Sequence, residues 1–206
     1  MTMKFFFGPH SCALASHIAL EEAGADYEGV RLDLKAGDQS KPEFLKVNPK
    51  ARVPALVTDR GVLTENPAIL AYIAQTHPAK KLAPLNDAYA FAKIQSFTAY
   101  LCATVHVAHA HKQRGYRWAD EQSSFDDMKR KVPESVSACF ELIENELLEG
   151  PWVAGANFSI ADPYLFTIAS WMEGDGVDPQ RFPKVLDHRN RMAQRVSVQK
   201  VLPHHA

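Results

Sequence analysis

The chain has 206 residues, of which 46% are apolar and 23% are charged, a composition typical of one large globular domain or two small ones. Its 23 basic and 24 acidic side chains give a formal net charge of −1 and are spread along the chain, which argues against nucleic acid and anionic membranes as partners. Three cysteines, Cys12, Cys102 and Cys139, lie far apart without a Cys-x-x-Cys spacing, which argues against a disulfide scaffold and a structural zinc site and favours a reducing, cytoplasmic location.

The beginning of the chain predicts a strand, a helix and a second strand. Residues 4–7 have strand character, and this apolar run, which is too short for the core of a signal peptide, ends at Gly8-Pro9. Ser11 is a favourable N-cap for a helix over residues 12–23, and Gly24 is placed to end that helix. Residues 27–34 alternate loosely in polarity, as a strand does. A β-α-β unit is therefore expected.

The next stretch predicts a loop, a hairpin and a helix. Residues 35–39 are a polar loop, and residues 42–47 form at most a short helix. Two apolar runs, 53–57 and 62–64, are separated by Asp59-Arg60-Gly61, which indicates a β-hairpin. Asn66 is then a predicted N-cap, with Pro67 at the first helical position, of a helix that stops near His77-Pro78.

The remainder of the chain is predicted to be helical. Apolar side chains keep a three-and-four spacing over residues 91–105 and over residues 132–147, where Pro133 is expected to kink the helix or begin it. A third helix is expected from Ser159 to about Met172. We therefore expect two domains, residues 1–78 and 87–206, joined by a linker over residues 79–86. No apolar run approaches the roughly 20 residues that a membrane span needs.

Cys12 is the first candidate for chemistry. A thiol in the first turn of a helix faces unpaired backbone N–H groups and the positive end of the helix dipole, and both favour a thiolate. A free cysteine has a pKa near 8.5, so a downward shift of about 2 units would make the thiol mostly ionised at neutral pH. The alternative is a small residue that fills a tight strand-to-helix turn.

Val53-Pro54 is the second candidate. A proline inside an apolar run belongs at a sheet edge or a turn, and its peptide bond can be cis. The backbone groups of Val53 would then be free to pair with a peptide ligand as an added strand does. A plain turn is the alternative.

The segment Glu65-Asn66-Pro67 is the third candidate. The N–H groups at the predicted helix start form an anion site suited to a carboxylate, and Glu65 could receive an ammonium group. An α-amino acid carries this pair of charges. The alternative is an ordinary capped helix beside a solvated glutamate.

Two further motifs concern metal binding and helix capping. His106 and His109 have helical i, i+3 spacing and His111 follows them, but no carboxylate or cysteine stands at ligand spacing, so a histidine that donates a hydrogen bond into a cleft is favoured over a metal site. Ser159 and Asp162 fit a capping box preceded by Phe158 as a staple residue, and for this motif the structural interpretation is favoured.

Four segments together resemble the glutathione transferases, and specifically their bacterial beta class. They are residues 9–18 (PHSCALASHI), 48–56 (NPKARVPAL), 63–66 (LTEN) and 158–162 (FSIAD), and the resemblance covers essentially the whole chain. It implies an α+β protein with the cytosolic glutathione transferase fold, which is a thioredoxin-like N-terminal domain followed by an all-helical domain. It also implies a homodimer that uses glutathione as co-substrate and needs no metal.

The resemblance assigns roles by position. It places Cys12 beside the glutathione sulfur, with His106 approaching from the helical domain. Lys35 would lie near the glycyl carboxylate, the loop with Arg52, Val53 and a cis-Pro54 would hold the cysteinyl backbone, and Glu65 and Asn66 would hold the γ-glutamyl end.

The chain departs from the family pattern at three positions. Phe7 stands where many members have a tyrosine that hydrogen-bonds the thiolate, Ala13 replaces a serine, and Ala99 replaces a polar residue. Ser11 or His10 would then have to supply the missing donor, and conjugating activity is expected to be weak.

The expected function is a detoxifying transferase that activates the glutathione thiol for attack on a small apolar electrophile. Aromatic residues that could line the electrophile cleft are Phe97, Tyr100, Tyr116 and Trp118, with packing in the core, the commoner fate of aromatic side chains, as the alternative. Two alternatives remain: glutathione-dependent thiol–disulfide exchange with Cys12 as the nucleophile, and a glutathione-binding protein without catalysis.

Overall fold

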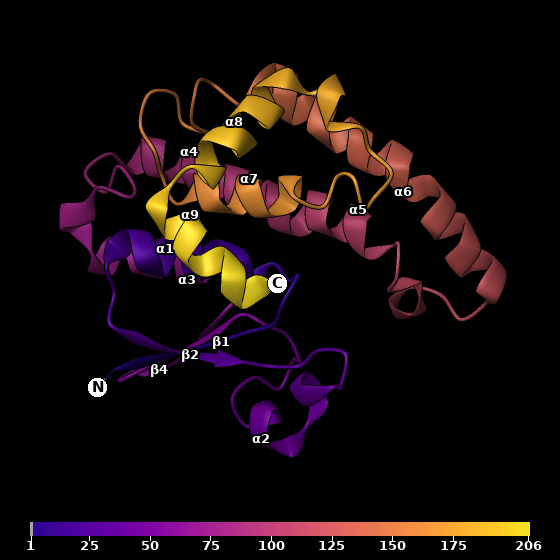
Figure 1. Ribbon diagram of the computed structural model, residues 1–206, viewed down its shortest axis with the longest axis horizontal. Coiled ribbons are helices and arrows are strands. Elements are labelled where there is room, and N and C mark those ends of the chain that lie inside the picture. The colour runs from indigo at the N-terminus through magenta and orange to yellow at the C-terminus, as the bar shows by residue number, and fades with distance from the viewer. Residues whose placement is uncertain (1) are drawn as a thin grey trace.

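The computed structural model describes residues 2–206 as a small sheet covered by successive layers of helices (Figure 1). Helices α1 (Ala13–Ala23) and α3 (Asn66–Thr76) lie on one face of the sheet, and the C-terminal helices cover α1 and α3 in turn. The short helix α2 (Pro42–Leu45) lies on the other side of the sheet. Among these residues no helix combines the length and the apolar character that crossing a membrane requires.

The sheet has the strand order β2-β1-β3-β4. Its strands are β1 (Met3–Phe7), β2 (Tyr27–Arg31), β3 (Ala55–Thr58) and β4 (Gly61–Thr64). β1 and β2 are parallel and joined by α1, whereas β3 is antiparallel to β1 and forms a hairpin with β4. The predicted β-α-β unit and hairpin are both confirmed, and this topology is thioredoxin-like.

Alternation along β1 decides which side chains meet which helix. Phe5 and Phe7 point to the α1 side and are almost fully buried, whereas Phe6 packs against Phe44 of α2. The second strand ends at Arg31 and not at the predicted residue 34. The reason is local, because the Asp33 carboxylate accepts the backbone N–H groups of Lys35 and Ala36 and turns the chain away from the sheet.

Helix α1 is buried on nearly all sides because it lies between the sheet and the helical domain. Its alanines belong to the large core cluster that also includes Phe5 and Phe7 of β1, while Leu14 and Ile18 pack with Phe166, Met192 and Val198 of the helical domain. Gly24 adopts a left-handed conformation with φ +61° and ends the helix, as predicted. The start of α1 is consequently held at the boundary between the two parts of the molecule.

The start of α3 differs from the prediction by one residue. The helix begins at Asn66 itself, Glu65 occupies the N-cap position with φ +72°, and Pro67 is the second helical residue. The Asn66 side chain does not cap α3, because it is used in hydrogen bonds to α1 instead. Because α3 begins at Asn66, the backbone N–H of Asn66 is the first N–H group of this helix, and Pro67, which has no N–H, is the second residue.

The helical domain follows a 3-10 turn at Pro78–Lys80 in and beside the predicted linker. Its helices are α4 (Ala88–Tyr100), α5 (His106–Ala110), α6 (Gln122–Leu142), α7 (Ala161–Ala169), α8 (Pro183–Ala193) and α9 (Val196–Val201). A π-helical turn, Leu101–Val105, joins α4 to α5. Pro133 lies inside α6, so the expectation that it could begin this helix is wrong.

The predicted capping box is confirmed at the start of α7. The Asp162 carboxylate accepts the backbone N–H of Ser159 at 2.6 Å, and the Ser159 hydroxyl accepts the N–H of Ala161 at 3.3 Å. Helix α7 itself is shorter than predicted, since it begins at Ala161 and ends at Ala169. The same carboxylate also accepts the N–H of Val153 at 2.8 Å and contacts His188 at 3.0 Å. The box therefore joins three segments of the helical domain.

Candidate active site

The turn between β1 and α1 is closed by Ser11. Its hydroxyl donates to the carbonyl of Gly8 at 2.7 Å and accepts the N–H of Ala13 at 3.3 Å. Ser11 thus fulfils the predicted capping function from just outside the helix, since Cys12 occupies the N-cap position. Because its hydrogen is already donated to Gly8, the hydroxyl is not free in this arrangement to donate to a ligand sulfur.

The Cys12 thiol is half-buried and donates to the carbonyl oxygen of Val53 at 3.6 Å. Burial raises the pKa of this thiol to about 12, and the charge of Arg114 opposes the rise only in part. This direction is opposite to the one that the helix position favours, and of the two interpretations of Cys12 it supports a protonated thiol. A helix terminus contributes about 0.3–1 kcal/mol, which is less than one pKa unit and too little to offset desolvation.

The loop that carries Val53 and Pro54 is organised by buried Asn48. The Asn48 side chain donates to the carbonyl of Arg52 at 2.6 Å and accepts the N–H of Lys50 at 3.2 Å. The Val53–Pro54 peptide bond is cis, in agreement with the resemblance. Within residues 2–206 the N–H of Val53 has no hydrogen-bond acceptor. A backbone donor and acceptor of one residue thus lie beside Cys12.

Glu65 already has an ammonium partner. Lys50 donates to its carboxylate and also to the Thr64 hydroxyl at 2.6 Å, and both charged side chains are about half exposed. The predicted ability of Glu65 to receive an ammonium group is therefore used within the chain. Sequence reasoning missed Lys50, because nothing local marks a residue that meets its partner 15 positions later.

The Asn66 side chain is buried and faces α1. It donates to the carbonyl of Cys12 at 2.8 Å and accepts the Ser16 hydroxyl at 2.5 Å. Its side-chain hydrogen bonds are therefore made within the chain, and the role of Asn66 in holding a ligand stays a prediction. What remains open at this position is the backbone N–H at the start of α3.

The basic residues on the sheet side of the site are exposed. Lys35 follows Leu34, whose side chain packs so tightly against Gly8 that a Cβ on the glycine would lie 2.5 Å from it. The Lys35 and Arg52 side chains form no ion pair or side-chain hydrogen bond with any residue from 2 to 206. Lys35 is thus held next to the turn that precedes α1.

His106 lies at the junction of the π-helical turn and α5. Its ring meets the face of Trp171 edge-on at a centroid distance of 5.2 Å. Burial lowers the pKa of His106 to about 3, and the charges of His109, Arg114 and Arg52 lower it further, so the imidazole is neutral at physiological pH. Arg114 and Arg52, which belong to different domains, therefore both lie within electrostatic reach of His106.

Arg114 connects the two halves of the site and was missed by sequence reasoning. Its half-buried guanidinium acts electrostatically on both Cys12 and His106, and burial lowers its own pKa. It forms no ion pair with residues 2–206. Because a lone arginine after a helix is a common surface feature, no sequence pattern could have distinguished it.

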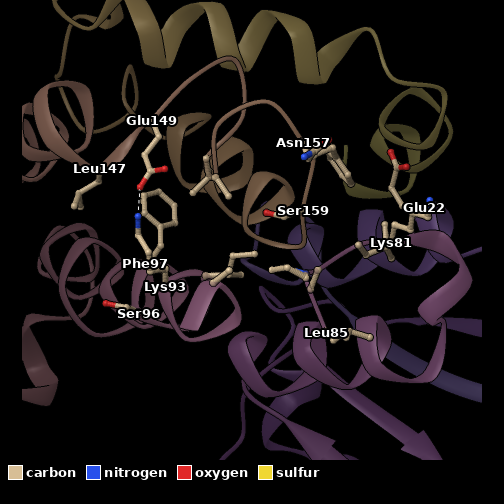
Figure 2. A pocket seen from close by; sticks show the side chains of 18 of the residues that line it. Glu22, Lys81, Leu85, Lys93, Ser96, Phe97, Leu147, Glu149, Asn157 and Ser159 are labelled. Carbon is tan, nitrogen blue, oxygen red and sulfur yellow. Dashed lines mark hydrogen bonds and ion pairs between the residues drawn. The ribbon is translucent and has the colours of Figure 1, made fainter. Parts of the chain in front are cut away.

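The aromatic residues expected around the electrophile fall into two groups. Phe97 and Tyr100 line a cavity of about 1320 Å³ between the linker, α4 and the segment before α7, together with Ser159 and the ion pair Lys93–Glu149 (Figure 2). That cavity contains none of the predicted site residues, so the expectation that Phe97 and Tyr100 line the electrophile cleft stays a prediction. Tyr116 and Trp118 are exposed and lie just beyond Arg114.

Two further expectations concern Phe7 and metal binding. The Phe7 ring packs against His17 at 4.8 Å and against His205 near the C-terminus at 4.9 Å, so its side of β1 is covered by α1 and the chain end. Over residues 2–206 no group of three or more His, Cys, Asp or Glu side chains could hold a metal ion.

Comparisons with known proteins agree with this geometry. The family model "Glutathione S-transferase, N-terminal domain" matches residues 1–75, and "Glutathione S-transferase, C-terminal domain" matches residues 113–191. Glutathione S-transferase GstA of Escherichia coli is 32% identical over 203 residues, 97% of each chain. A glutathione transferase homologue from Sulfitobacter with bound glutathione is 45% identical over 98% of each chain, with a TM-score of 0.95. The bacterial beta class enzyme of Sphingomonas chungbukensis is 35% identical over 98% of each chain, with a TM-score of 0.86.

Proposed function

The chain belongs to the glutathione S-transferase family and is a glutathione transferase, and from this premise we propose how it holds its substrates. Glutathione binds along the edge formed by Val53 and the start of α3, with its sulfur at the amino end of α1. Its γ-glutamyl end meets Glu65, and its glycyl carboxylate points to Lys35 and Arg52. A small apolar electrophile approaches from the helical domain beside His106.

The observation that carries this proposal is the pair of backbone groups of Val53. Its N–H is unpaired within residues 2–206, and its carbonyl is occupied only by the weak S–H donor of Cys12. An extended peptide binds such an edge by exchanging two backbone hydrogen bonds, as an added strand does. The glutathione ammonium group takes the place beside Glu65 that Lys50 fills here.

The raised pKa of Cys12 changes the role proposed for its thiol. When the ligand's N–H occupies the Val53 carbonyl, the protonated thiol of Cys12 is released and donates a hydrogen bond to the glutathione sulfur. Arg114 adds a positive charge within electrostatic reach of the same place. Both effects favour the glutathione thiolate, of which only a few per cent is present in solution at pH 7. A neutral Cys12 is a poor nucleophile, which disfavours thiol–disulfide exchange through this residue.

The assembly and the location belong to the same proposal. Leu85, Tyr89 and Leu142 are large apolar side chains that remain exposed, and Leu85 and Leu142 border the same cavity beside the linker. We propose that this face is covered in a homodimer, and that the protein is cytoplasmic, in keeping with its three free cysteines. The proposed domain limits stay at residues 1–78 and 87–206.

Replacement of Cys12 separates transfer from exchange. In Cys12→Ala, kcat/KM for conjugation of chlorodinitrobenzene should fall by no more than about tenfold, which is the effect of one lost hydrogen bond. Loss of all turnover would favour exchange through Cys12. Cys139→Ala, in the buried face of α6, is the matched control and should behave as wild type.

Calorimetry tests the binding geometry independently of turnover. Glu65→Gln should weaken glutathione binding about tenfold or more, because a charged hydrogen bond to the ammonium group is lost. Glu149→Gln removes a carboxylate of similar exposure at the other cavity and is the control. Absence of glutathione binding to the wild-type protein would refute the proposed function.

A further inference from the structure

A buried aspartate orients a histidine one helical turn after His106. The Nδ1 atom of His109, on α5, lies 2.9 and 2.7 Å from the two carboxylate oxygens of Asp175, which follows α7. The Asp175 side chain is only 2% exposed. Since an ionised carboxylate only accepts hydrogen bonds, Nδ1 must carry the hydrogen, and Nε2 is the atom left for other partners.

The ring of His109 is fixed on its second side as well. It stacks on Trp171 with a centroid distance of 4.3 Å and an interplanar angle of 26°. His106 contacts the same indole edge-on, and the two imidazole centroids are 6.2 Å apart. His109 and His106 therefore share Trp171 as a neighbour, and Arg52 and Arg114 lie within electrostatic reach of His106.

The free edge of His109 is open to solvent. Its side chain is 28% exposed, whereas the carboxylate at Nδ1 is enclosed, so the exposed edge is the one that carries Nε2. Within residues 2–206 that nitrogen has no hydrogen-bond partner. The titratable groups that face His109 are Asp175, Lys112, whose Nζ is 3.6 Å from Asp175, and His106.

Enclosing a carboxylate is unfavourable by several kcal/mol unless it is paired, and here the pairing falls to two side chains that are themselves partly exposed. An imidazole held by a buried carboxylate, with its second nitrogen open, is the arrangement that proton transfer requires.

We propose that His109, oriented by Asp175, is a catalytic proton donor for electrophiles whose attacked group becomes an oxyanion, of which epoxides are the simplest class. The inference rests on the proposed function, because it needs glutathione at the start of α1 and the electrophile against the helical domain. Asp175 acts through His109 and is a positioning residue.

The step balances without a further reactant. The glutathione sulfur forms a bond to an epoxide carbon, the bond from that carbon to oxygen breaks, and its electron pair stays on oxygen. The protonated ring of His109 transfers the Nε2 proton to that oxygen and is left neutral, and water returns the proton. Displacement of chloride from an aromatic halide has no such oxyanion, so it makes no use of this proton.

The test is the ratio of kcat/KM for styrene oxide to kcat/KM for chlorodinitrobenzene. His109→Asn retains a donor toward Asp175 but carries no titratable proton, and it should lower this ratio about a hundredfold, as loss of a general acid does. Asp175→Asn should lower the ratio in the same direction, through kcat for the epoxide and not through its KM. The matched control is His111→Asn, a nearby histidine that contacts Trp118 edge-on and should leave the ratio unchanged.

The outcomes separate this inference from the proposed function. An unchanged ratio in His109→Asn, or a wild-type enzyme that conjugates the halide but never the epoxide, overturns the role of His109. A folded wild-type protein that binds glutathione and conjugates neither substrate overturns the transferase function itself. If His109→Asn fails to fold, the wild-type enzyme still decides: a solvent deuterium isotope effect is expected on the epoxide reaction and not on the halide reaction, and its absence from both contradicts the proposal.

Discussion

Two aspartate–histidine pairs in the helical domain have the same chemistry and different surroundings. Asp162 contacts His188 at 3.0 Å, and neither side chain has any exposed surface. Asp175 contacts His109 at 2.7 Å, but the imidazole is 28% exposed. The closed pair is cut off from any substrate, whereas the open pair keeps one ring edge accessible.

The hydrogen-bond partners of the two carboxylates also differ. Asp162 also accepts the N–H groups of Val153 and Ser159, so it ties the segment before α7, the start of α7 and α8 together. Within residues 2–206, the partners of the Asp175 carboxylate are the side chains of His109 and Lys112. A buried carboxylate that accepts backbone N–H groups connects segments of the fold, whereas one whose partners are two partly exposed side chains is suited to orient the imidazole for chemistry.

Removing the closed carboxylate should have the largest effect. Asp162→Ala leaves two backbone N–H groups and His188 without their acceptor in a site that water does not reach. We expect a loss of about 3–5 kcal/mol in the free energy of unfolding, measured by urea denaturation. A loss below about 1 kcal/mol would mean that the capping box is not the joint described here.

The stability of the protein at acidic pH depends on a third pair, which is buried and consists of two histidines. His17 and His205 are buried with Nδ1 and Nε2 2.9 Å apart. Burial lowers the pKa of His17 to about 4 and that of His205 to about 3 from 6.5, so the unfolded chain binds more protons than the folded one between these values. Stability should therefore be complete above pH 6.5 and fall by about 3 kcal/mol for each of the two histidines as the pH drops to 4.

The control for this pH dependence is a variant with one ring fewer. His205→Gln keeps a polar partner for His17, and the slope between pH 6.5 and 4 should become shallower. His106, with a pKa also lowered by burial, contributes part of the remaining slope. An identical slope in the variant would show that this pair does not titrate as described.

Removing the open carboxylate should cost less than removing the closed one. In Asp175→Ala, His109 and Lys112 can turn to water, since each is about a quarter exposed. We expect a loss of about 1–2 kcal/mol in the free energy of unfolding together with a lower rate toward epoxides. A stability loss as large as that of Asp162→Ala would mean that Asp175, like Asp162, mainly holds the fold together.

The smallest effect is expected at the surface. Lys93 and Glu149 form an exposed ion pair at the edge of the linker-side cavity (Figure 2), where water and salt compete for both charges. Lys93→Gln should leave the urea midpoint within experimental error. A measurable shift would show that this ion pair, unlike most exposed pairs, supports the contact between α4 and the segment before α7.

The sequence predicted elements well where the signal is local. Gly24, the hairpin turn at Asp59-Arg60-Gly61 and the capping box are each specified by residues within a few positions, and all three are confirmed. The errors have local causes that were overlooked, such as the turn at Asp33, or tertiary causes, such as the use of Asn66 by α1. Propensity and periodicity cannot anticipate the latter, because the competing partner is far away in the chain.

The same distinction between local and tertiary causes applies to the candidate site. The segment resemblance assigned roles to Cys12, Val53 and Glu65. The position of Cys12 at a helix start suggested a thiolate, whereas burial raises the pKa of this thiol. Phe97 was expected to line the electrophile cleft, and it lines a cavity that contains none of the predicted site residues. Arg114 and Asp175 escaped notice altogether, because their significance depends on what lies next to them.

The sequence by itself determined the order of elements, the family and the residues at the start of α1 and α3, because turns, caps and periodic apolar positions act over a few residues. Only the tertiary structure decided which charges are buried and what they face. His188 lies 26 positions from Asp162, and His109 lies 66 positions from Asp175. The physical reason is that desolvation and pairing depend on distance in space, and chain packing alone decides that distance.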